Sequence, residues 1–274
     1  MLGNALLRLF AGSENFRAVA SVRNSDSRSR LPRSLQSHIE TGVDVDDIDA
    51  LARFIAAQEP DVVINCIGLI KQLSEADDPL LALPINAMLP HRLARMCAPI
   101  NARLIHISTD CVFDGAKGNY VEDDFPDAKD LYGRSKLLGE VDYPNAITLR
   151  TSIIGHELGT NHGLVEWFLS QTGRVQGYER AIFSGLPTVE LGQVIRDFVI
   201  PRPDLCGLFH VSAAPINKLE LLKLIARHYA KTIEIVPDRR VVIDRSLDSS
   251  KFRRKTQYAP PSWDALVEKM RKFG

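Results

Sequence analysis

The stretch that decides the fold covers residues 104–136 and reads LIHISTDCVFDGAKGNYVEDDFPDAKDLYGRSK. Its apolar start, Leu104–Ile107, predicts a short buried strand bounded by polar residues. The triplet Ser108–Asp110 follows at the carboxyl end of that strand, where open α/β sheets bind their ligands. Tyr132 and Lys136 have the spacing of residues that share one helix face. A hydroxyl, a phenol and an amine near a strand end indicate redox chemistry on a carbonyl group.

The regions on either side of this stretch alternate between strand and helix patterns. Alternation of this kind predicts an α/β fold, a Rossmann-type doubly wound parallel sheet with a small C-terminal substrate lobe. The continuous apolar run at residues 61–68 further predicts a strand buried on both faces. The expected strands are residues 19–22, 61–68, 104–107 and 146–150, and the expected helices are residues 2–12, 47–58, 86–97 and 132–140.

The pattern becomes less regular after residue 155, and we expect a domain boundary there. Residues 1–155 are predicted to form the dinucleotide-binding domain, and residues 156–274 a substrate-binding lobe partly interleaved with it. Within the lobe we expect a loop at 159–163, helices at 164–171, 189–198, 218–230 and 262–273, a strand at 208–211 and a turn-rich segment at 173–187.

Composition excludes several classes of protein. Lys+Arg and Asp+Glu both number 34, so no general charge favours nucleic acid or a membrane surface. The four cysteines are scattered without a Cys-x-x-Cys pair, and neither a metal site nor a disulfide framework is indicated. The longest uncharged run, residues 79–90, is too short to span a bilayer. A cytoplasmic protein without a metal fits these features best.

Several short motifs together carry a family resemblance. They are Ser-Thr-Asp-Cys-Val-Phe from residue 108, Leu-Tyr-Gly-Arg-Ser-Lys from 131, Leu-Arg-Thr-Ser from 149, Gly-Leu-Pro-Thr from 185, Gly-Leu-Phe-His-Val from 207 and Leu-Asp-Ser-Ser-Lys from 247. In this order they resemble the dTDP-4-dehydrorhamnose reductase-like sugar-nucleotide reductases, a group of the extended short-chain dehydrogenase/reductases. The resemblance extends over nearly the whole chain.

The resemblance assigns catalysis to Thr109, Tyr132 and Lys136. A free tyrosine has a pKa of about 10, and a neighbouring ammonium lowers it by favouring the phenolate. Tyr132 would then serve as general acid, with Lys136 lowering its pKa. Thr109 would hydrogen-bond the same substrate oxygen and stabilise the charge that develops on it.

The expected cofactor is NADPH, with NADH as the alternative. NAD-selective sheets usually carry an acid at the end of the second strand, whereas an arginine there suits a 2′-phosphate. Here Arg23 occupies that position, which favours NADPH. By resemblance, Asp44 would meet the adenine, and Cys66 and Gly68 would pass under the nicotinamide half. Ser108, Tyr132 and Lys136 complete the expected cofactor-binding set.

The start of the chain departs from the family pattern. The family begins with a strand and a Gly-x-x-Gly-x-x-Gly turn, of which only Gly3 can be assigned here. Those glycines let the backbone approach the pyrophosphate at a helix N-terminus. We therefore expect the strands at residues 19–22 and 61–68 to border a gap, and we expect weak cofactor binding by the chain as written.

A nucleotide-sugar substrate requires hydrogen-bond donors and local positive charge. Arg150, Arg245 and Lys251 lie in segments that resemble the substrate lobe, and each could equally be a surface charge. Together with Thr109 and Asp110 they form the expected substrate-binding set.

Other side chains in these segments that could bind a ligand or act as a nucleophile have a simpler interpretation. His156 and His162 come without metal-ligand spacing and are interpreted as loop histidines. Trp167 lies on an apolar helix face and is expected in the core. Cys111 has no basic partner nearby in sequence, which favours an inert packed thiol.

The predicted function is NADPH-dependent reduction of dTDP-4-dehydro-L-rhamnose to dTDP-L-rhamnose for cell-surface polysaccharide synthesis. A 4,6-dehydratase would carry Thr-Asp-Glu where Cys111 stands, which argues against dehydration. A sugar-nucleotide 4-epimerase uses the same tyrosine and lysine, and a cofactor-binding regulatory subunit without turnover uses the same fold. These two alternatives stay open, as do the nucleotide base, the exact sugar and the formation of a homodimer.

Overall fold

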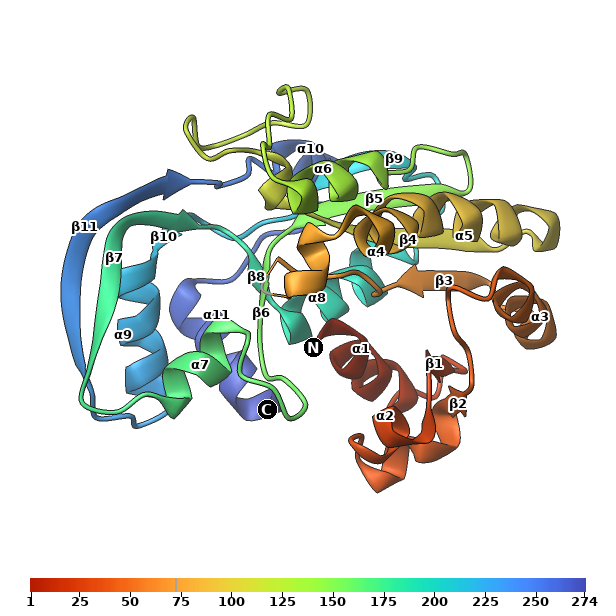
Figure 1. Cartoon of the computed structure of the whole chain (residues 1–274), viewed down its shortest axis with the longest axis horizontal. Helices are drawn as coiled ribbons and strands as arrows, with labels where there is room; N and C mark the ends of the chain where they lie inside the picture. The colour runs from red at the N-terminus through yellow and green to blue at the C-terminus, as the bar shows by residue number, and fades with distance from the viewer. Residues whose placement is uncertain (72) are drawn as a thin grey trace. The chain divides into compact units, whose positions relative to one another are not determined.

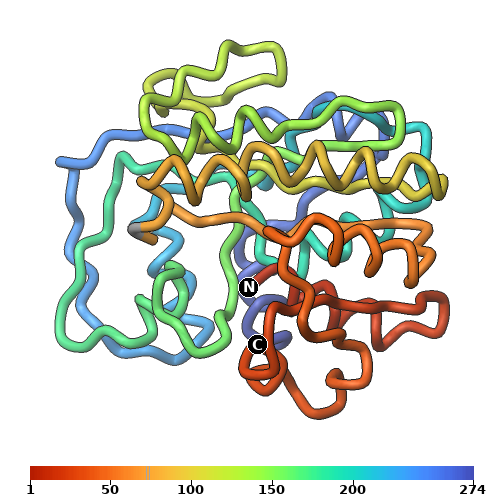
Figure 2. Tube along the Cα trace, turned by 45° about the vertical axis from the view of Figure 1, so that its right-hand side comes forward, coloured from red at the N-terminus to blue at the C-terminus, as the bar shows by residue number. Residues whose placement is uncertain are grey.

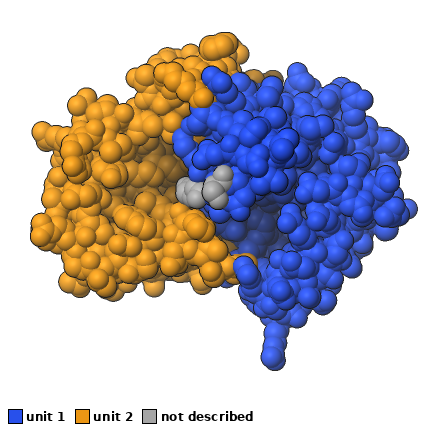
Figure 3. All heavy atoms as spheres, in the orientation of Figure 1, with its two compact units in different colours: residues 1–108, 130–149, 199–208 blue, residues 109–129, 150–198, 209–274 orange. Residues whose placement is uncertain are grey.

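A computed structural model describes residues 1–71 and 73–274 of the chain. The chain divides into two compact units, each built from three segments, and Figure 3 colours them separately. Unit 1 consists of Met1–Ser108, Asp130–Leu149 and Val199–Leu208. Unit 2 consists of Thr109–Lys129, Arg150–Phe198 and Phe209–Gly274. The two units are therefore interleaved in sequence, and each is described by itself below.

A four-stranded sheet with the order β3-β4-β5-β9 organises unit 1 (Figure 1). Its strands are β3 (Val62–Asn65), β4 (Arg103–Thr109), β5 (Ala146–Thr151) and β9 (Gly207–His210). The last residues of the latter three belong to unit 2. β3 and β4 run parallel, with Val62 opposite Arg103. Parallel strands separated by helices confirm the expected Rossmann-type α/β fold.

The core of unit 1 is formed by apolar faces of helices and strands. Helix α3 (Ile48–Gln58) contributes Leu51 and Ile55, and α5 (Leu89–Cys97) contributes Leu93. These side chains pack in one cluster with Leu104 of β4, which is fully buried. The apolar residues at helical spacing in α3 and α5 therefore form one core cluster together with Leu104 of β4.

The prediction that the strand at residues 61–68 is buried on both faces is wrong. β3 covers only Val62–Asn65, and Val62, Val63 and Ile64 are half-buried. The reason is its place at the edge of the four-stranded sheet. An apolar run cannot distinguish a central strand from an edge strand, because strand order is set by tertiary contacts.

The first strands form a separate sheet. Helix α1 (Leu2–Ala11) precedes β1 (Ala20–Val22), which pairs in parallel with β2 (Ile39–Thr41). Among the described residues, no ladder joins β1 to β3, in agreement with the expected gap between these two strands. The intervening segment holds two short helices, α2 (Ser25–Ser29) and the 3-10 helix η1 (Arg33–His38).

Residues 79–97 form one helical stretch despite three prolines, visible in Figures 1 and 2. It consists of α4 (Pro79–Ala82), the π-helical segment η3 (Leu83–Met88) and α5, with the 3-10 helices η2 (Ser74–Asp77) before it and η4 (Ala98–Ile100) after it. Pro79 lies in the first turn of the stretch, where its missing N–H removes no intrahelical hydrogen bond, whereas Pro84 and Pro90 lie inside it, near the two changes between α-helix and π-helix. The predicted helix at 86–97 is thus confirmed and begins earlier. π segments of this kind are frequent at functional sites.

Unit 2 contains a three-stranded sheet that sequence analysis missed. Its strands, in the order β10-β7-β11, are β10 (Ile216–Asn217), β7 (Arg174–Phe183) and β11 (Glu234–Asp244). β7 and β11 are the long strands beside helix α9 (Lys218–His228) in Figure 1. The expectation of turns at residues 173–187 is therefore wrong. Gly177 is a packing glycine, because a Cβ there would lie 2.5 Å from Leu219 Cδ1 of helix α9.

The helices expected for the second half of the chain are confirmed. They are α7 (Leu164–Ser170), α8 (Thr188–Val194) with its π-helical continuation η6 (Ile195–Val199), α9 (Lys218–His228) and α11 (Trp263–Phe273). The structure adds a helix and a two-stranded sheet, namely α10 (Ser250–Thr256), and β6 (Ile153–Ile154) paired with β8 (Leu186–Pro187). In the described part of the chain, no helix is both long enough and apolar enough to cross a membrane.

Candidate active site

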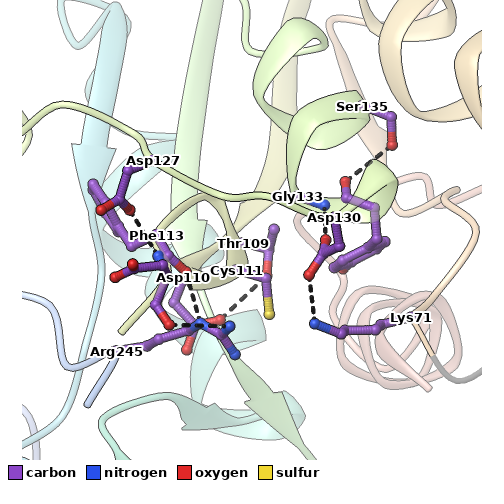
Figure 4. Close-up of polar contacts among 12 residues, drawn as sticks. Lys71, Thr109, Asp110, Cys111, Phe113, Asp127, Asp130, Gly133, Ser135 and Arg245 are labelled. Carbon is purple, nitrogen blue, oxygen red and sulfur yellow. Dashed lines mark hydrogen bonds and ion pairs between the residues drawn. The ribbon is translucent and has the colours of Figure 1, made fainter. Parts of the chain in front are cut away.

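Helix α6 (Leu131–Leu138) carries Tyr132 and Lys136, as predicted. Asp130 caps its N-terminus, because Asp130 Oδ1 accepts a hydrogen bond of 2.7 Å from the Gly133 backbone N–H. The other carboxylate oxygen of Asp130 accepts a 2.6 Å bond from Lys71 Nζ (Figure 4). Ser135 Oγ donates to the Tyr132 carbonyl at 2.9 Å. The first turn of α6, which presents Tyr132, is therefore fixed at several points.

Lys136 is buried beside the end of β4. Its ammonium donates a hydrogen bond of 2.8 Å to the Ile107 carbonyl, and only 6% of the residue is exposed. Burial lowers the pKa of Lys136 to about 8, and the negative charge of Glu140 acts in the opposite direction. A lysine with this pKa is mostly protonated at neutral pH and close to losing its proton.

Ser108 is hydrogen-bonded to Glu140, which lies just beyond the end of α6. Its Oγ donates a 2.7 Å hydrogen bond to Glu140 Oε1, and the serine is 4% exposed. Ser108 was predicted to contact the cofactor, and in the structure its hydroxyl proton is directed at this carboxylate. Sequence analysis missed Glu140, although its i+4 spacing from Lys136 is one at which oppositely charged side chains often interact.

The loop after β3 lies against Lys136. A Cβ added to Gly68 would be 3.3 Å from Asn86 Oδ1 and 3.9 Å from Lys136 Nζ. Asn86, in the π-helical segment η3, bonds to both backbone groups of Leu69, at 2.9 Å and 3.2 Å. The structure therefore brings Gly68 together with Lys136, while Asn86 was not singled out from the sequence.

The remaining predicted cofactor residues also lie in unit 1. A Cβ at Gly3 of α1 would be 3.7 Å from the Cβ of Cys66, so these two residues are neighbours. Arg23 Nε lies 3.5 Å from Asp44 Oδ2, in an ion pair whose side chains are 61% and 43% exposed. Arg23 follows β1, and Asp44 follows the strand that pairs with it. An arginine and an acid therefore occupy neighbouring positions at this sheet edge.

Thr109 begins unit 2 and caps the short 3-10 helix η5 (Asp110–Val112). Its Oγ1 accepts a 3.1 Å bond from the Cys111 backbone N–H, shown in Figure 4, and donates a 3.2 Å bond to Asp110 Oδ1. A substrate oxygen that accepts a bond from Thr109 would therefore take over the proton now directed at Asp110.

Asp110 is a buried acid with two basic neighbours. Burial raises the pKa of Asp110, and the charges of Arg245 and Lys218 oppose this rise. Arg245 Nε also donates a 2.7 Å bond to the Phe113 carbonyl, which fixes the guanidinium in this part of unit 2.

Lys218, at the start of α9, places its ammonium 4.4 Å from the centre of the Phe183 ring. Burial lowers the pKa of Lys218, whereas Asp110 and Cys111 oppose the change.

Lys218 was not found from the sequence. It lies more than a hundred residues after Asp110, and no motif joins the two positions. The packing of α9 against β7, with Lys218 over the Phe183 ring, helps to bring the lysine to this acid.

Arg150 is buried and therefore not a surface charge. It is 3% exposed, its guanidinium carbon lies 5.3 Å from the centre of the Phe113 ring, and one of its nitrogens is 3.3 Å from His210 Nε2. Burial and the Arg150 charge together lower the pKa of His210 to about 4. Lys251 Nζ lies 4.8 Å from the centre of the Phe209 ring. Two of the three basic residues expected in the substrate set, Arg150 and Lys251, thus rest on aromatic rings of unit 2.

One expectation about the surrounding segments needs correction. Trp167 is not a core residue, because it is 37% exposed on α7. His156 lies in a loop, as expected, and its ring also has two partners: Nδ1 lies 2.6 Å from Glu166 Oε1 and Nε2 lies 2.8 Å from the Tyr229 hydroxyl. His162 is exposed in the loop before α7, as expected.

The donor set of unit 1 fits a nicotinamide dinucleotide. A buried ammonium and a phenol on one helix face suit ribose hydroxyls, and an exposed arginine at the end of a parallel strand suits a phosphate. No cluster of three or more potential metal ligands occurs in residues 1–71 and 73–274.

Comparison with known proteins yields one family. A family model described as the RmlD substrate binding domain matches residues 1–272. Over 115 residues the chain is 41% identical to the dTDP-4-dehydrorhamnose reductase of Mycolicibacterium smegmatis, covering 40% of this chain and 35% of that protein. Over 94 residues it is 36% identical to methionine adenosyltransferase 2 subunit beta of Xenopus laevis, covering 34% of this chain and 28% of that protein. The aligned part thus spans about a third of each relative's length.

Among solved structures, the chain is similar to a hypothetical dTDP-4-dehydrorhamnose reductase from Sulfolobus tokodaii. The TM-score is 0.77 at 27% identity, and the match covers 96% of this chain and 94% of that one. The fold is therefore shared over nearly the full length of both. With a family model that extends from residue 1 to residue 272, the chain belongs to the family of the RmlD substrate binding domain.

Proposed function

We propose that this protein reduces the 4-keto group of a 4-keto-6-deoxy sugar nucleotide, with dTDP-4-dehydro-L-rhamnose as the first substrate to test. The product would be dTDP-L-rhamnose, a precursor for cell-surface polysaccharide. The observation that carries the proposal is the buried Lys136, held at the end of β4 and one helical turn after Tyr132. The family and the printed names of its relatives support the same reaction.

In this proposal Tyr132 donates a proton to the carbonyl oxygen as that oxygen gains negative charge. The ammonium of Lys136 favours the loss of the phenolic proton and also binds ribose hydroxyls. Thr109, the last residue of β4, donates a hydrogen bond to the same oxygen and leaves Asp110 when it does so. When bound, the reduced nicotinamide supplies the hydride.

The proposed cofactor is NADPH, held by Gly3, Arg23, Asp44, Cys66, Gly68, Ser108, Tyr132 and Lys136. Arg23 supports the choice because its half-exposed guanidinium could accept a 2′-phosphate as a partner. The ion pair with Asp44 acts against it, since an acid at this edge favours free ribose hydroxyls. A comparison of NADPH binding with NADH binding therefore decides which cofactor the protein prefers.

The proposed substrate-binding residues are Thr109, Asp110, Arg150, Arg245 and Lys251, to which we add Lys218. Asp110 can accept hydrogen bonds from sugar hydroxyls. Arg245 and Lys218, which both interact with it, leave a positive charge that suits a diphosphate. Arg150 would act mainly by supporting Phe113 and His210, because it is buried among them.

The test is turnover by the purified chain. Mixed with NADPH and dTDP-4-dehydrorhamnose, it should oxidise NADPH in proportion to the dTDP-L-rhamnose that forms, measured by absorbance and by NMR of the sugar. A Thr109→Val variant should lose about 10²–10³-fold in rate, the effect of removing one oxyanion donor. Thr41→Val, at the exposed last position of β2, is the matched control and should keep the wild-type rate.

Assays with a second sugar nucleotide and a cofactor-binding measurement decide between the alternatives. Interconversion of dTDP-glucose and dTDP-galactose without net cofactor oxidation would instead indicate a 4-epimerase. Cofactor binding without turnover of either sugar would indicate a binding subunit, an alternative that the similarity to methionine adenosyltransferase 2 subunit beta favours. Either result would contradict the proposed reductase.

A further inference from the structure

Two hydrogen bonds connect the end of β4 to the end of α6 in unit 1. Lys136 Nζ donates to the Ile107 carbonyl at 2.8 Å, and Ser108 Oγ donates to Glu140 Oε1 at 2.7 Å. Ile107 and Ser108 are consecutive residues of β4. The Lys136 ammonium and the Glu140 carboxylate therefore form hydrogen bonds with two consecutive residues at the end of β4.

The place of Glu140 is fixed by packing as well as by this bond. Gly139 ends α6, and its backbone N–H bonds to carbonyls of the last turn. A Cβ at Gly139 would collide with the Asn86 carbonyl oxygen of η3. The backbone before Glu140 therefore has close contact with a neighbouring helical segment and little freedom to move.

The carboxylate also acts on the charge of Lys136. A buried ammonium is costly unless an acid or several acceptors stabilise it. Burial lowers the pKa of Lys136 to about 8, and Glu140 is the acid that opposes this shift. Without that acid, burial alone would lower the pKa of Lys136 further and leave less ammonium at neutral pH.

Other titratable groups around α6 do not replace Glu140. β4 contributes His106, whose pKa is held well below its ordinary value by burial and by the Lys136 charge, so it stays neutral. Of the segments that contact α6, η3 and α4 carry no titratable side chain. η2 carries Glu75 and Asp77, which are both exposed. α5 carries His91, whose Nε2 lies 2.8 Å from the Leu138 carbonyl oxygen and which brings no negative charge. On α6 itself, Tyr132 is the proposed acid and Arg134 is exposed.

We propose that Glu140 is a positioning residue for the reduction: its carboxylate holds Ser108 at the end of β4 and keeps the Lys136 ammonium charged beside Tyr132. The inference rests on the proposed function of Tyr132 and Lys136 but concerns a property of the cofactor-free protein. It extends the active site to a residue outside α6 that contacts neither substrate nor cofactor in the proposed mechanism.

The direct test is the titration of Lys136 in the full chain without cofactor or substrate. Isotope-labelled lysine is followed by NMR, and the Lys136 signal is assigned as the one lost in Lys136→Met. Glu140→Gln keeps an acceptor for Ser108 but removes the charge, and it should lower the Lys136 midpoint by about one pH unit. Glu140→Asp should restore much of it. Asp142→Asn, an exposed carboxylate two residues further on, is the matched control and should leave the midpoint unchanged.

A second variant separates charge from position. Ser108→Ala keeps both charges but releases the carboxylate from β4, and we expect a smaller downward shift than in Glu140→Gln. It also keeps the proposal testable if the Gln variant does not fold. A Lys136 midpoint that stays at the wild-type value in Glu140→Gln, or in Ser108→Ala where the Gln variant is unfolded, would overturn the proposed role.

The pH profile of turnover gives the functional readout. The alkaline limb of kcat for NADPH oxidation should move toward neutral pH in Glu140→Gln and return in Glu140→Asp. A purely structural role would lower kcat equally at every pH, which would also overturn the proposal. If the NMR shift is seen but wild type reduces no sugar nucleotide, the proposed function fails while the effect of Glu140 on Lys136 stands.

Discussion

Each unit of the molecule places a lysine near an acid, and the two lysines differ in burial and in what holds them: Lys136 is buried, whereas Lys218 is half-buried. Lys136 in unit 1 donates to a backbone carbonyl and is opposed in charge by Glu140. Lys218 in unit 2 lies over the Phe183 ring and is opposed by Asp110, whose own pKa is raised by burial. Burial lowers the pKa of both lysines.

The difference points to different tasks. The carbonyl bond of Lys136 fixes its ammonium in one place, as needed for a group that acts on Tyr132 in every turnover. Lys218 rests on an aromatic face and shares its acid with Arg245, so its ammonium can turn to a ligand without leaving a backbone acceptor unpaired. In the proposed reaction, Lys136 therefore takes part in the chemical step and Lys218 in substrate binding, and the following variants test that division.

The largest effect is expected for Lys136→Met. Removing the ammonium leaves Tyr132 without the charge that favours proton release, and kcat should fall by about 10²–10⁴-fold, the range for acid–base groups. Single-turnover NADPH oxidation measures this step. If kcat is retained and only KM rises, Lys136 binds substrate as Lys218 does, and the division between the two lysines is wrong.

The stability of the protein should report the burial of Lys136 directly. Its folded pKa of about 8 lies below the ordinary value of 10.5, so the unfolded chain holds the proton over that interval. Wild-type stability relative to Lys136→Met should therefore rise as the pH increases from about 8 to about 10.5, and stay constant below. Between about pH 7.5 and 9.5 the expected gain is about 2 kcal/mol. Urea unfolding of both proteins measures it, and a difference independent of pH would contradict a depressed pKa.

Lys218→Met should weaken substrate binding and leave the chemical step unchanged. A hydrogen bond to a charged group contributes about 1.5–3 kcal/mol, so KM should rise about 10- to 100-fold at constant kcat. Lys223→Met is the matched control, since Lys223 lies on the same helix with a half-exposed side chain paired to Glu220. Equal KM values for the two variants would remove Lys218 from the substrate site.

Arg23 is the exposed cation to compare with these two lysines. Arg23→Asp should weaken NADPH binding by about tenfold or more and affect NADH much less, because only NADPH carries the 2′-phosphate. Calorimetric titration of both cofactors measures the ratio. Arg30→Asp, an exposed arginine after α2, controls for general charge. Equal losses for NADPH and NADH would mean that Arg23 has no part in cofactor choice.

The surroundings of Lys136 could be predicted, because the sequence signals for them are local. Tyr132 and Lys136 are four residues apart on one helix, and the Ser108–Asp110 triplet ends an adjacent apolar strand. Helical spacing and strand ends are readable from the sequence alone. The α/β alternation of unit 1 is equally local, and the expected helices and strands appear within a few residues of their predicted bounds.

The surroundings of Lys218 could not be predicted, because the contacts there join segments that are far apart in the sequence. The sheet that supports Lys218 pairs residues of β7 with residues of β11 about sixty positions later. Gly177 lies in the segment that was expected to be turn-rich, whereas its small size is needed where α9 packs on β7. The pairing of Lys218 with Asp110 depends on that packing. Tertiary contacts of this kind override local patterns, and one sequence does not display them.

The central claim is that Tyr132 donates the proton to a sugar-nucleotide carbonyl. Its most direct test is single-turnover reduction of dTDP-4-dehydrorhamnose by Tyr132→Phe, together with a titration of NADPH binding. The account predicts a loss of rate of about 10²–10⁴-fold with NADPH binding nearly unchanged, because the phenol acts in the transition state. A variant that keeps more than about a tenth of the wild-type rate would contradict the claim.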